Sequence, residues 1–89
     1  MAKVSVKLPV GMTTAGGGRQ VECEAATVAE ALQLAIATEP RLRSRIFRED
    51  GRMWAGVFLN ARNINALGGL GTPLKDGDKL SVVPPISGG

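Results

Sequence analysis

The chain has 89 residues, 44% of them apolar, and a formal net charge of +3. This length allows one small domain with a modest core, and so small a positive charge does not by itself indicate nucleic-acid binding. Because there is no histidine and a single cysteine, the sequence excludes histidine-based catalytic triads, histidine-ligated metals, an internal disulfide and paired-cysteine motifs. With one Trp, two Phe and no Tyr, it also lacks an aromatic platform for bases. We expect no metal site and no nucleic-acid partner.

The N-terminal segment alternates from Lys3 onward and has no continuous apolar stretch of the kind found in signal peptides. No segment reaches the roughly 18 apolar residues of a membrane span. A single cysteine suits a reducing compartment. We therefore expect a cytoplasmic protein that does not contact a membrane.

Two strands are predicted near the N-terminus, because residues 3–8 and 19–24 alternate between polar and apolar side chains. Pro9 ends the first strand, and the Gly- and Thr-rich residues 10–18 predict a long loop. The side chains predicted to face inward are Val4, Val6, Leu8, Val21 and Cys23.

A helix is predicted after the second strand, beginning with a capping box formed by Thr27 and Glu30. Pro40 is expected to end it, and Leu34 is expected to be partly exposed. Residues 42–47 predict a second, short helical turn. The apolar stripe of the main helix consists of Val28, Ala31, Leu32, Ala35 and Ile36.

Three further strands are predicted, at residues 55–60, 62–65 and 79–83, with a turn at Asp76-Gly77 before the last one. In the last strand, Leu80 and Val82 should face inward. A helix across one face of a mixed sheet buries both apolar surfaces economically. The fold class is therefore α+β, and if the first and last strands pair at the centre, the fold is a ubiquitin-like β-grasp.

The glycine-rich segment at residues 67–78, LGGLGTPLKDGD, does not fit a phosphate-binding loop. Its glycines are followed by Thr72-Pro73 instead of a helix start, and two aspartates would repel phosphate. We interpret it as a packed connection. Leu67, Leu70 and Leu74 are predicted to pack into the core as apolar plugs of this connection.

The chain ends in PPISGG, residues 84–89. Two prolines favour an extended conformation, so the tail could project up to roughly 20 Å from the body. Glycines at the last two positions would let the tip enter a channel too narrow for other residues. The sequence therefore predicts a domain at residues 1–83 and a flexible, extended tail at 84–89 that presents its terminal carboxylate.

The pattern LGGLGTPLKDGD, a short apolar strand and then PPISGG resembles the ubiquitin-like sulfur-carrier family, which includes the small subunit of molybdopterin synthase and the carriers of the thiamine and cysteine pathways. In that family the last glycine is adenylated and converted to a thiocarboxylate, a role that falls here on Gly89. Tail recognition would involve Gly88, Ser87 and Ile86. The resemblance also implies docking of partners through apolar residues around the last strand, here Val83 and Phe58.

The resemblance implies that the chain is a carrier or small subunit and not an enzyme. Its partners would be an adenylyltransferase of the ubiquitin-activating type, a sulfur donor and an acceptor such as the large subunit of molybdopterin synthase. The carrier would bind no cofactor of its own, since the activating partner uses the ATP. The glycine-rich insertion at 10–18 is more typical of the cysteine-pathway type and the PPISGG ending of the molybdopterin type, so the pathway stays open.

Two other functions remain possible from the residues: a protein modifier joined to lysines through Gly89, and an interaction domain whose tail has no role. Five arginines within residues 41–52 form either a solvated rim or a basic patch that guides association with an acidic partner. Cys23 is interpreted as a core residue, with a pKa raised by Glu22 and Glu24.

Overall fold

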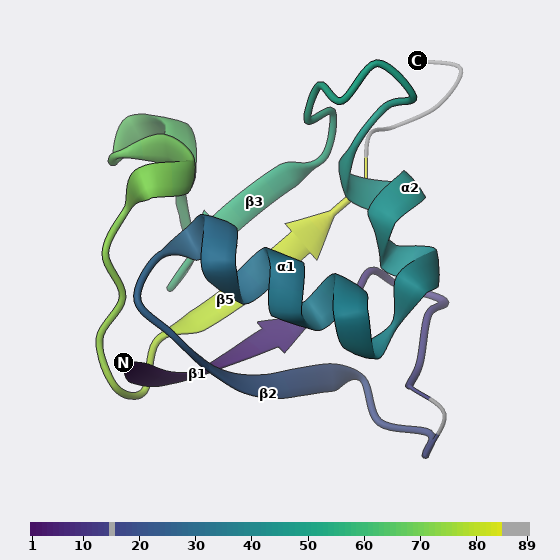
Figure 1. The fold of residues 1–89 in the computed structure, drawn as a ribbon, viewed down its shortest axis with the longest axis horizontal. Coiled ribbons are helices and arrows are strands. Elements are labelled where there is room, and N and C mark those ends of the chain that lie inside the picture. The colour runs from purple at the N-terminus through teal and green to yellow at the C-terminus, as the bar shows by residue number, and fades with distance from the viewer. Residues whose placement is uncertain (15, 85–89) are drawn as a thin grey trace.

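The structure, a computed structural model, describes residues 1–14 and 16–84. Five strands in this part of the chain form one mixed sheet, and one main helix lies against it (Figure 1). The elements in chain order are β1 (Ala2–Lys7), β2 (Gln20–Ala25), α1 (Val28–Thr38), the 3-10 turn η1 (Pro40–Leu42), α2 (Arg43–Ile46), β3 (Gly56–Leu59), β4 (Arg62–Asn63), the 3-10 turns η2 (Ile64–Ala66) and η3 (Gly69–Gly71), and β5 (Lys79–Val83).

The sheet places the first and last strands side by side, in the order β2-β1-β5-β3-β4. β1 and β5 run parallel with Val6 opposite Leu80, whereas β2 pairs with β1, and β3 with β5, in antiparallel orientation. This central parallel pair next to antiparallel neighbours is the arrangement on which the prediction depended. The ubiquitin-like β-grasp fold is therefore confirmed.

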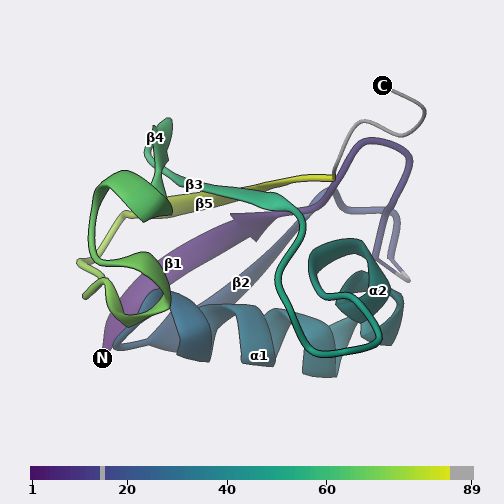
Figure 2. The ribbon, with the colours of Figure 1, turned by 90° about the horizontal axis from the view of Figure 1, so that it is seen from above.

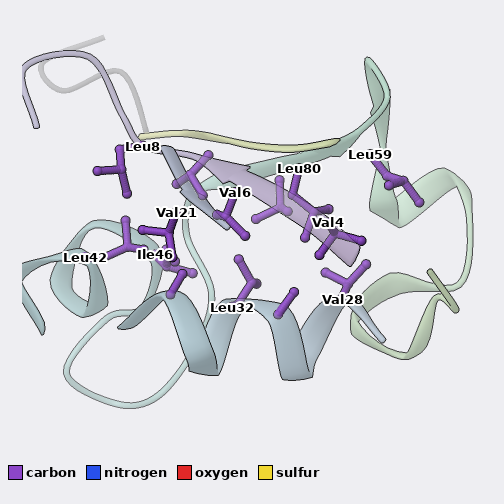
Figure 3. Packing of buried hydrophobic residues seen from close by; sticks show 14 of the residues in the cluster. Val4, Val6, Leu8, Val21, Val28, Leu32, Leu42, Ile46, Leu59 and Leu80 are labelled. Carbon is purple, nitrogen blue, oxygen red and sulfur yellow. The ribbon is translucent and has the colours of Figure 1, made fainter. Parts of the chain in front are cut away.

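α1 lies along one face of the sheet (Figure 2), and the core lies between the two. Val6 and Leu80 of the sheet and Leu32 of the helix are each at most 1% exposed, and their side chains point toward one another in Figure 3. Both predicted apolar patterns, the period of two in the strands and the helical stripe, converge here. The inward positions of β5 and the partial exposure of Leu34 are confirmed as well.

The start of α1 follows the predicted capping box with one change. Thr27 accepts a hydrogen bond from the backbone N–H of Glu30 at 3.3 Å, as expected. The Glu30 carboxylate, however, accepts from the N–H of Ala26 at 3.0 Å and not from that of Thr27. The helix ends before Pro40, and the predicted second helical segment is present as η1 and α2.

Two predictions for residues 60–70 need correction. Only Arg62–Asn63 forms the fourth strand, since residues 64–66 turn into η2. Leu67 is 37% exposed and is not a plug, because η2 turns it outward; Leu70 and Leu74 do pack against the core. Hydrogen bonds of one side chain close the segment: the Thr72 hydroxyl accepts from the N–H of Gly68 and donates to the Gly69 carbonyl.

None of the helices in the described part of the chain has the length and apolar character needed to cross a membrane.

Candidate functional site

The last strand delivers the C-terminal segment to one end of the sheet. β5 is a central strand in which Leu80 and Val82 are buried while Val83 is 49% exposed. Because β1 runs parallel to β5 and β3 antiparallel, β1 also finishes, and β3 begins, at the end where β5 finishes at Val83. We call this the tail end of the molecule. Two hydrogen-bonded neighbours hold the strand that leads to residues 84–89.

Val83 and Phe58 lie on the same outer face of the sheet, away from α1. Gly56 pairs with Val83 across β3 and β5, and Phe58 is two residues further along β3. A Cβ atom added to Gly56 would lie 3.1 Å from a ring carbon of Phe58 and 3.7 Å from the Val83 carbonyl oxygen. The Phe58 ring therefore lies over Gly56, the residue opposite Val83 on the same face of the sheet. We call these three residues the outer apolar patch.

The remaining predicted site residues, Ile86, Ser87, Gly88 and Gly89, lie outside the described residues. Their roles stay predictions, as does the division into residues 1–83 and 84–89. What the structure does place is the point of departure, because β5 ends at Val83. No group of three or more metal-ligating side chains occurs among the residues that the structure describes.

Cys23 is only partly buried, on the edge strand β2, and packs against the core. Burial raises the pKa of its thiol, and the Glu30 carboxylate on α1 adds to the effect. The expected direction is therefore right, but its cause was wrong, since neither neighbour in the strand contributes. Loss of water and a nearby negative charge both disfavour the thiolate, so this thiol is a poor nucleophile at neutral pH.

A charged pair closes the corner after α1. Arg41 donates to the Glu39 carboxylate at 2.7 Å and to the Thr13 carbonyl at 2.9 Å. The hydrogen bond from Arg41 lowers the pKa of the Glu39 carboxyl group, and its positive charge acts in the same direction. This pair fastens the glycine-rich loop to the helical corner and is a structural link.

The model of the ThiS family matches residues 12–89, which includes β5 and the whole C-terminal segment. The chain belongs to the ThiS family. The predicted resemblance to ubiquitin-like sulfur carriers is thereby confirmed at the level of the family.

Relatives of this ThiS-family chain include carriers and modifiers. Small archaeal modifier protein 1 of Haloferax volcanii is 33% identical over 86 residues, which cover 93% of this chain and 97% of the relative. Among solved structures, small archaeal modifier protein 1 of Methanosarcina acetivorans superposes with a TM-score of 0.82 at 32% identity, covering 100% of this chain and 98% of that one. A chain of the BexX/CysO complex of Amycolatopsis orientalis gives a TM-score of 0.78 at 31% identity, with coverages of 97% and 99%.

One feature of the tail end was missed by the sequence analysis. Trp54 is 48% exposed, and its indole N–H donates to the Ser44 carbonyl of α2 at 3.2 Å. It stands two residues before β3, whose first residue pairs with Val83. A lone Trp between an arginine-rich segment and a strand was the available signal, but its position depends on the pairing of β3 with β5.

Proposed function

We propose that this chain is a sulfur carrier whose terminal carboxyl group, at Gly89, is activated and then converted to a thiocarboxylate. The observation that carries the proposal is the family match extending through residue 89, on a fold whose central strand β5 leads directly into that segment. A reacting group at the chain end needs a body that partners can grip. The outer apolar patch, which includes Val83 at the end of β5, supplies such a surface.

The chemistry at Gly89 would take two steps. The carboxylate oxygen attacks the α-phosphorus of ATP, which releases pyrophosphate and leaves an acyl adenylate. Bisulfide, delivered by a sulfur donor, then attacks the carbonyl carbon of the acyl adenylate. A C–S bond forms, the bond between the carbonyl carbon and the bridging oxygen breaks, and AMP leaves with that oxygen. A carboxylate is a poor electrophile, and the first step replaces a poor leaving group with a good one.

The catalytic groups for both steps would come from partners, so we propose a carrier and not an enzyme. The partners are an ATP-dependent adenylyltransferase, a sulfur donor and an acceptor enzyme that takes the sulfur. The similar chain of the BexX/CysO complex was crystallised with another protein, which supports a function that depends on a partner. The reducing cytoplasm suits this chemistry, because a thiocarboxylate is readily oxidised.

The acceptor decides the pathway. The PPISGG ending favours molybdopterin biosynthesis, with cysteine, thiamine or a secondary metabolite as the alternatives. Presenting the thiolated carrier to the large subunit of molybdopterin synthase, and separately to a cysteine-forming acceptor, distinguishes them by which one consumes the thiocarboxylate.

A second candidate function is protein modification through an isopeptide bond between Gly89 and lysines. It is favoured by the two relatives named small archaeal modifier protein 1. Both functions would begin with the same adenylation. They differ in the nucleophile that attacks the activated carboxyl group of Gly89, which is sulfur in a carrier and a lysine amine in a modifier.

The test incubates the purified chain with its cognate adenylyltransferase, ATP and sulfide and measures the intact mass. We expect a gain equal to the exchange of one oxygen for sulfur. A variant lacking Gly89 should show no gain, whereas Lys75→Ala, an exposed change at the opposite end, should behave as wild type. Ladders of conjugates on other proteins would favour the modifier, and no change in the wild-type mass would contradict the proposal.

A further inference from the structure

The positive charge of the chain is concentrated in one segment. Residues 41–52 contain five arginines, Glu49 and Asp50, whereas the rest of the chain has six Lys or Arg and six Asp or Glu. The net charge of +3 is therefore carried by this segment alone. Such a concentration creates a local positive potential even on a chain of modest total charge.

Two of these arginines are already paired and others are not. Arg41 binds Glu39, and Arg52 lies 3.8 Å from Asp50, whose carboxylate also accepts from the Arg52 backbone. Arg45 and Arg48 are exposed and have no ion pair among the residues that the structure describes. Their positive charges are therefore available to a partner.

The arginine-rich segment is fixed at the tail end of the sheet. The Trp54 backbone N–H donates to the Ile46 carbonyl at 2.9 Å, and its indole N–H donates to the Ser44 carbonyl, so α2 is fastened to the chain just before β3. Figures 1 and 2 both place α2 at the end toward which β1 and β5 run. Because Gly56 pairs with Val83, the same end presents the outer apolar patch.

Trp54 gives this charged surface an apolar anchor. Its ring is half exposed yet held by the bond to Ser44, so little conformational entropy would be lost when a partner covers it. Beside it is a hollow of about 500 Å³, lined also by Phe47 and Arg48. Trp and Arg are the residue types that most often dominate the binding energy of protein interfaces.

We propose that Arg45, Arg48 and Trp54 form a docking surface for an acidic region of the adenylyltransferase, beside the opening that admits the tail. We call these three residues the arginine–tryptophan surface. This inference rests on the proposed function and extends it, because it names the surface and the charge that the activating partner must have. Contact here would hold the body while the C-terminal segment enters the active site of the partner.

An acidic protein surface fits this site better than RNA. Glu49 and Asp50 line the same hollow and would repel any anion placed against them. A protein surface can set carboxylates against the arginines and hydrogen-bond donors against these two acidic side chains, whereas a uniform phosphate backbone cannot. RNA binding also needs successive aromatic platforms, and Trp54 is the one aromatic residue exposed to this degree in the described part of the chain.

The test compares two double charge reversals with the same change in net charge. Arg45→Glu/Arg48→Glu alters the docking surface, and Arg62→Glu/Lys75→Glu alters two exposed positions at the opposite end. Adenylation is followed as ATP–pyrophosphate exchange by the cognate adenylyltransferase, with the carrier as the varied substrate. We expect the first pair to raise KM about tenfold at roughly 50 mM salt, with kcat nearly unchanged, and the control pair to stay within about twofold.

Varying the salt concentration and substituting Trp54 separate the charged part of the proposed interface from its apolar part. Raising the salt to about 0.5 M should shrink the difference between wild type and Arg45→Glu/Arg48→Glu, because screening weakens surface charge pairs. Trp54→Ala should raise KM at both salt concentrations, since an apolar contact is not screened by salt. The backbone bond from residue 54 to the Ile46 carbonyl is kept in the variant, so its far-ultraviolet circular dichroism should stay that of the wild type.

The outcomes separate this inference from the proposed function. Absence of exchange with the wild-type chain would overturn both. Normal exchange with equal KM values for the two reversed pairs would overturn only the docking surface. Binding of a labelled single-stranded RNA at about 150 mM salt, lost in Arg45→Glu/Arg48→Glu but not in the control pair, would assign the surface to RNA instead.

Discussion

The two ends of the central strands use their polar side chains differently. Where β5 begins, the polar groups bind one another: Asp76 accepts from the N–H of Lys3 at 2.8 Å, and Asp78 accepts from the Asn60 amide at 2.9 Å. Where β5 finishes, at the tail end, Arg45 and Arg48 extend into solvent with no ion pair in the described part of the chain.

Apolar side chains are exposed at both ends, but in different surroundings. At the end where β5 begins, Ile64 is fully buried within η2, and the exposed apolar side chains are those of Met1 and Leu67. At the tail end, Val10, Trp54 and Val83 are 97%, 48% and 49% exposed. What distinguishes the tail end is an exposed tryptophan beside two arginines that have no ion pair among the described residues. A stable small domain does not need this combination, which suits binding to a partner.

The largest expected effect tests the end where β5 begins. Ile64→Ala removes a fully buried side chain and should lower the free energy of unfolding by about 2–5 kcal/mol, measured by urea denaturation. KM for adenylation should not change under conditions where the variant is folded. Val10→Ala, at the exposed tail end, is the control and should leave the stability unchanged. Equal losses in both variants would remove the distinction between the ends.

The second prediction compares two exposed apolar residues, one at each end. Val83→Ala and Leu67→Ala both shorten a side chain that is more than one third exposed, so each should change the free energy of unfolding by less than about 0.5 kcal/mol. If Val83 is buried by the activating partner, its truncation should raise KM about five- to tenfold. Leu67→Ala should leave KM at the wild-type value, and an equal rise in both would contradict the placement of the interface.

The third prediction concerns pH and the corner that carries the arginine segment. The pKa of Glu39 is lowered in the folded chain from its ordinary 4.5. Its ion pair with Arg41 therefore stabilises the fold above that pH, and the contribution is lost as the pH falls through the lowered pKa. Glu39→Gln should thus have a lower Tm than wild type at pH 7, and the gap should close in acid, as thermal unfolding across pH would show.

The control for this pH effect is Glu49→Gln, which removes the same charge from an exposed side chain with no hydrogen bond among the described residues. Its Tm should follow that of the wild type at every pH. A Tm gap for Glu39→Gln that stayed constant into acid would show that the packing of Glu39 matters and its charge does not.

Local patterns were sufficient to predict the strands and the main helix, because each depends on alternation or helical spacing within a few residues. The central pairing of β1 with β5 joins residues more than 70 positions apart and entered the prediction only as a condition. Local patterns failed where the outcome depended on distant contacts. The turn at Asn60 and Ala61 uses positive φ values of 49° and 72°, and hydrogen bonds of the Asn60 side chain to Asp78 and the Lys79 N–H fix it. Asn adopts positive φ readily, so Asn60 is a weak local signal for the turn, whereas Ala61 gives none.

The candidate site was predictable to a similar extent. Val83 and Phe58 could be assigned to an outer face by alternation, but their adjacency depends on the register that sets Gly56 opposite Val83. The arginines were visible in the sequence, whereas their position at the tail end depends on the bonds from Trp54 to α2. Sequence patterns specify which face a side chain occupies, and long-range pairing specifies its neighbours.

The smallest expected effect asks whether the body takes part in the chemistry at all. Cys23 is the one sulfur nucleophile in the sequence, and burial together with Glu30 raises its pKa, so its thiolate is scarce at neutral pH. Cys23→Ala should leave the yield and rate of thiocarboxylate formation, followed by intact mass, within about twofold of wild type. The wild-type thiol should react with iodoacetamide more slowly than free cysteine at pH 7, and its rate should continue to rise with pH beyond the point where free cysteine levels off.

Loss of thiocarboxylate in Cys23→Ala would mean that Cys23 on β2 carries sulfur on its way to Gly89. The body would then take part in the chemistry, and the distinction between a passive body and a reactive tail would fail.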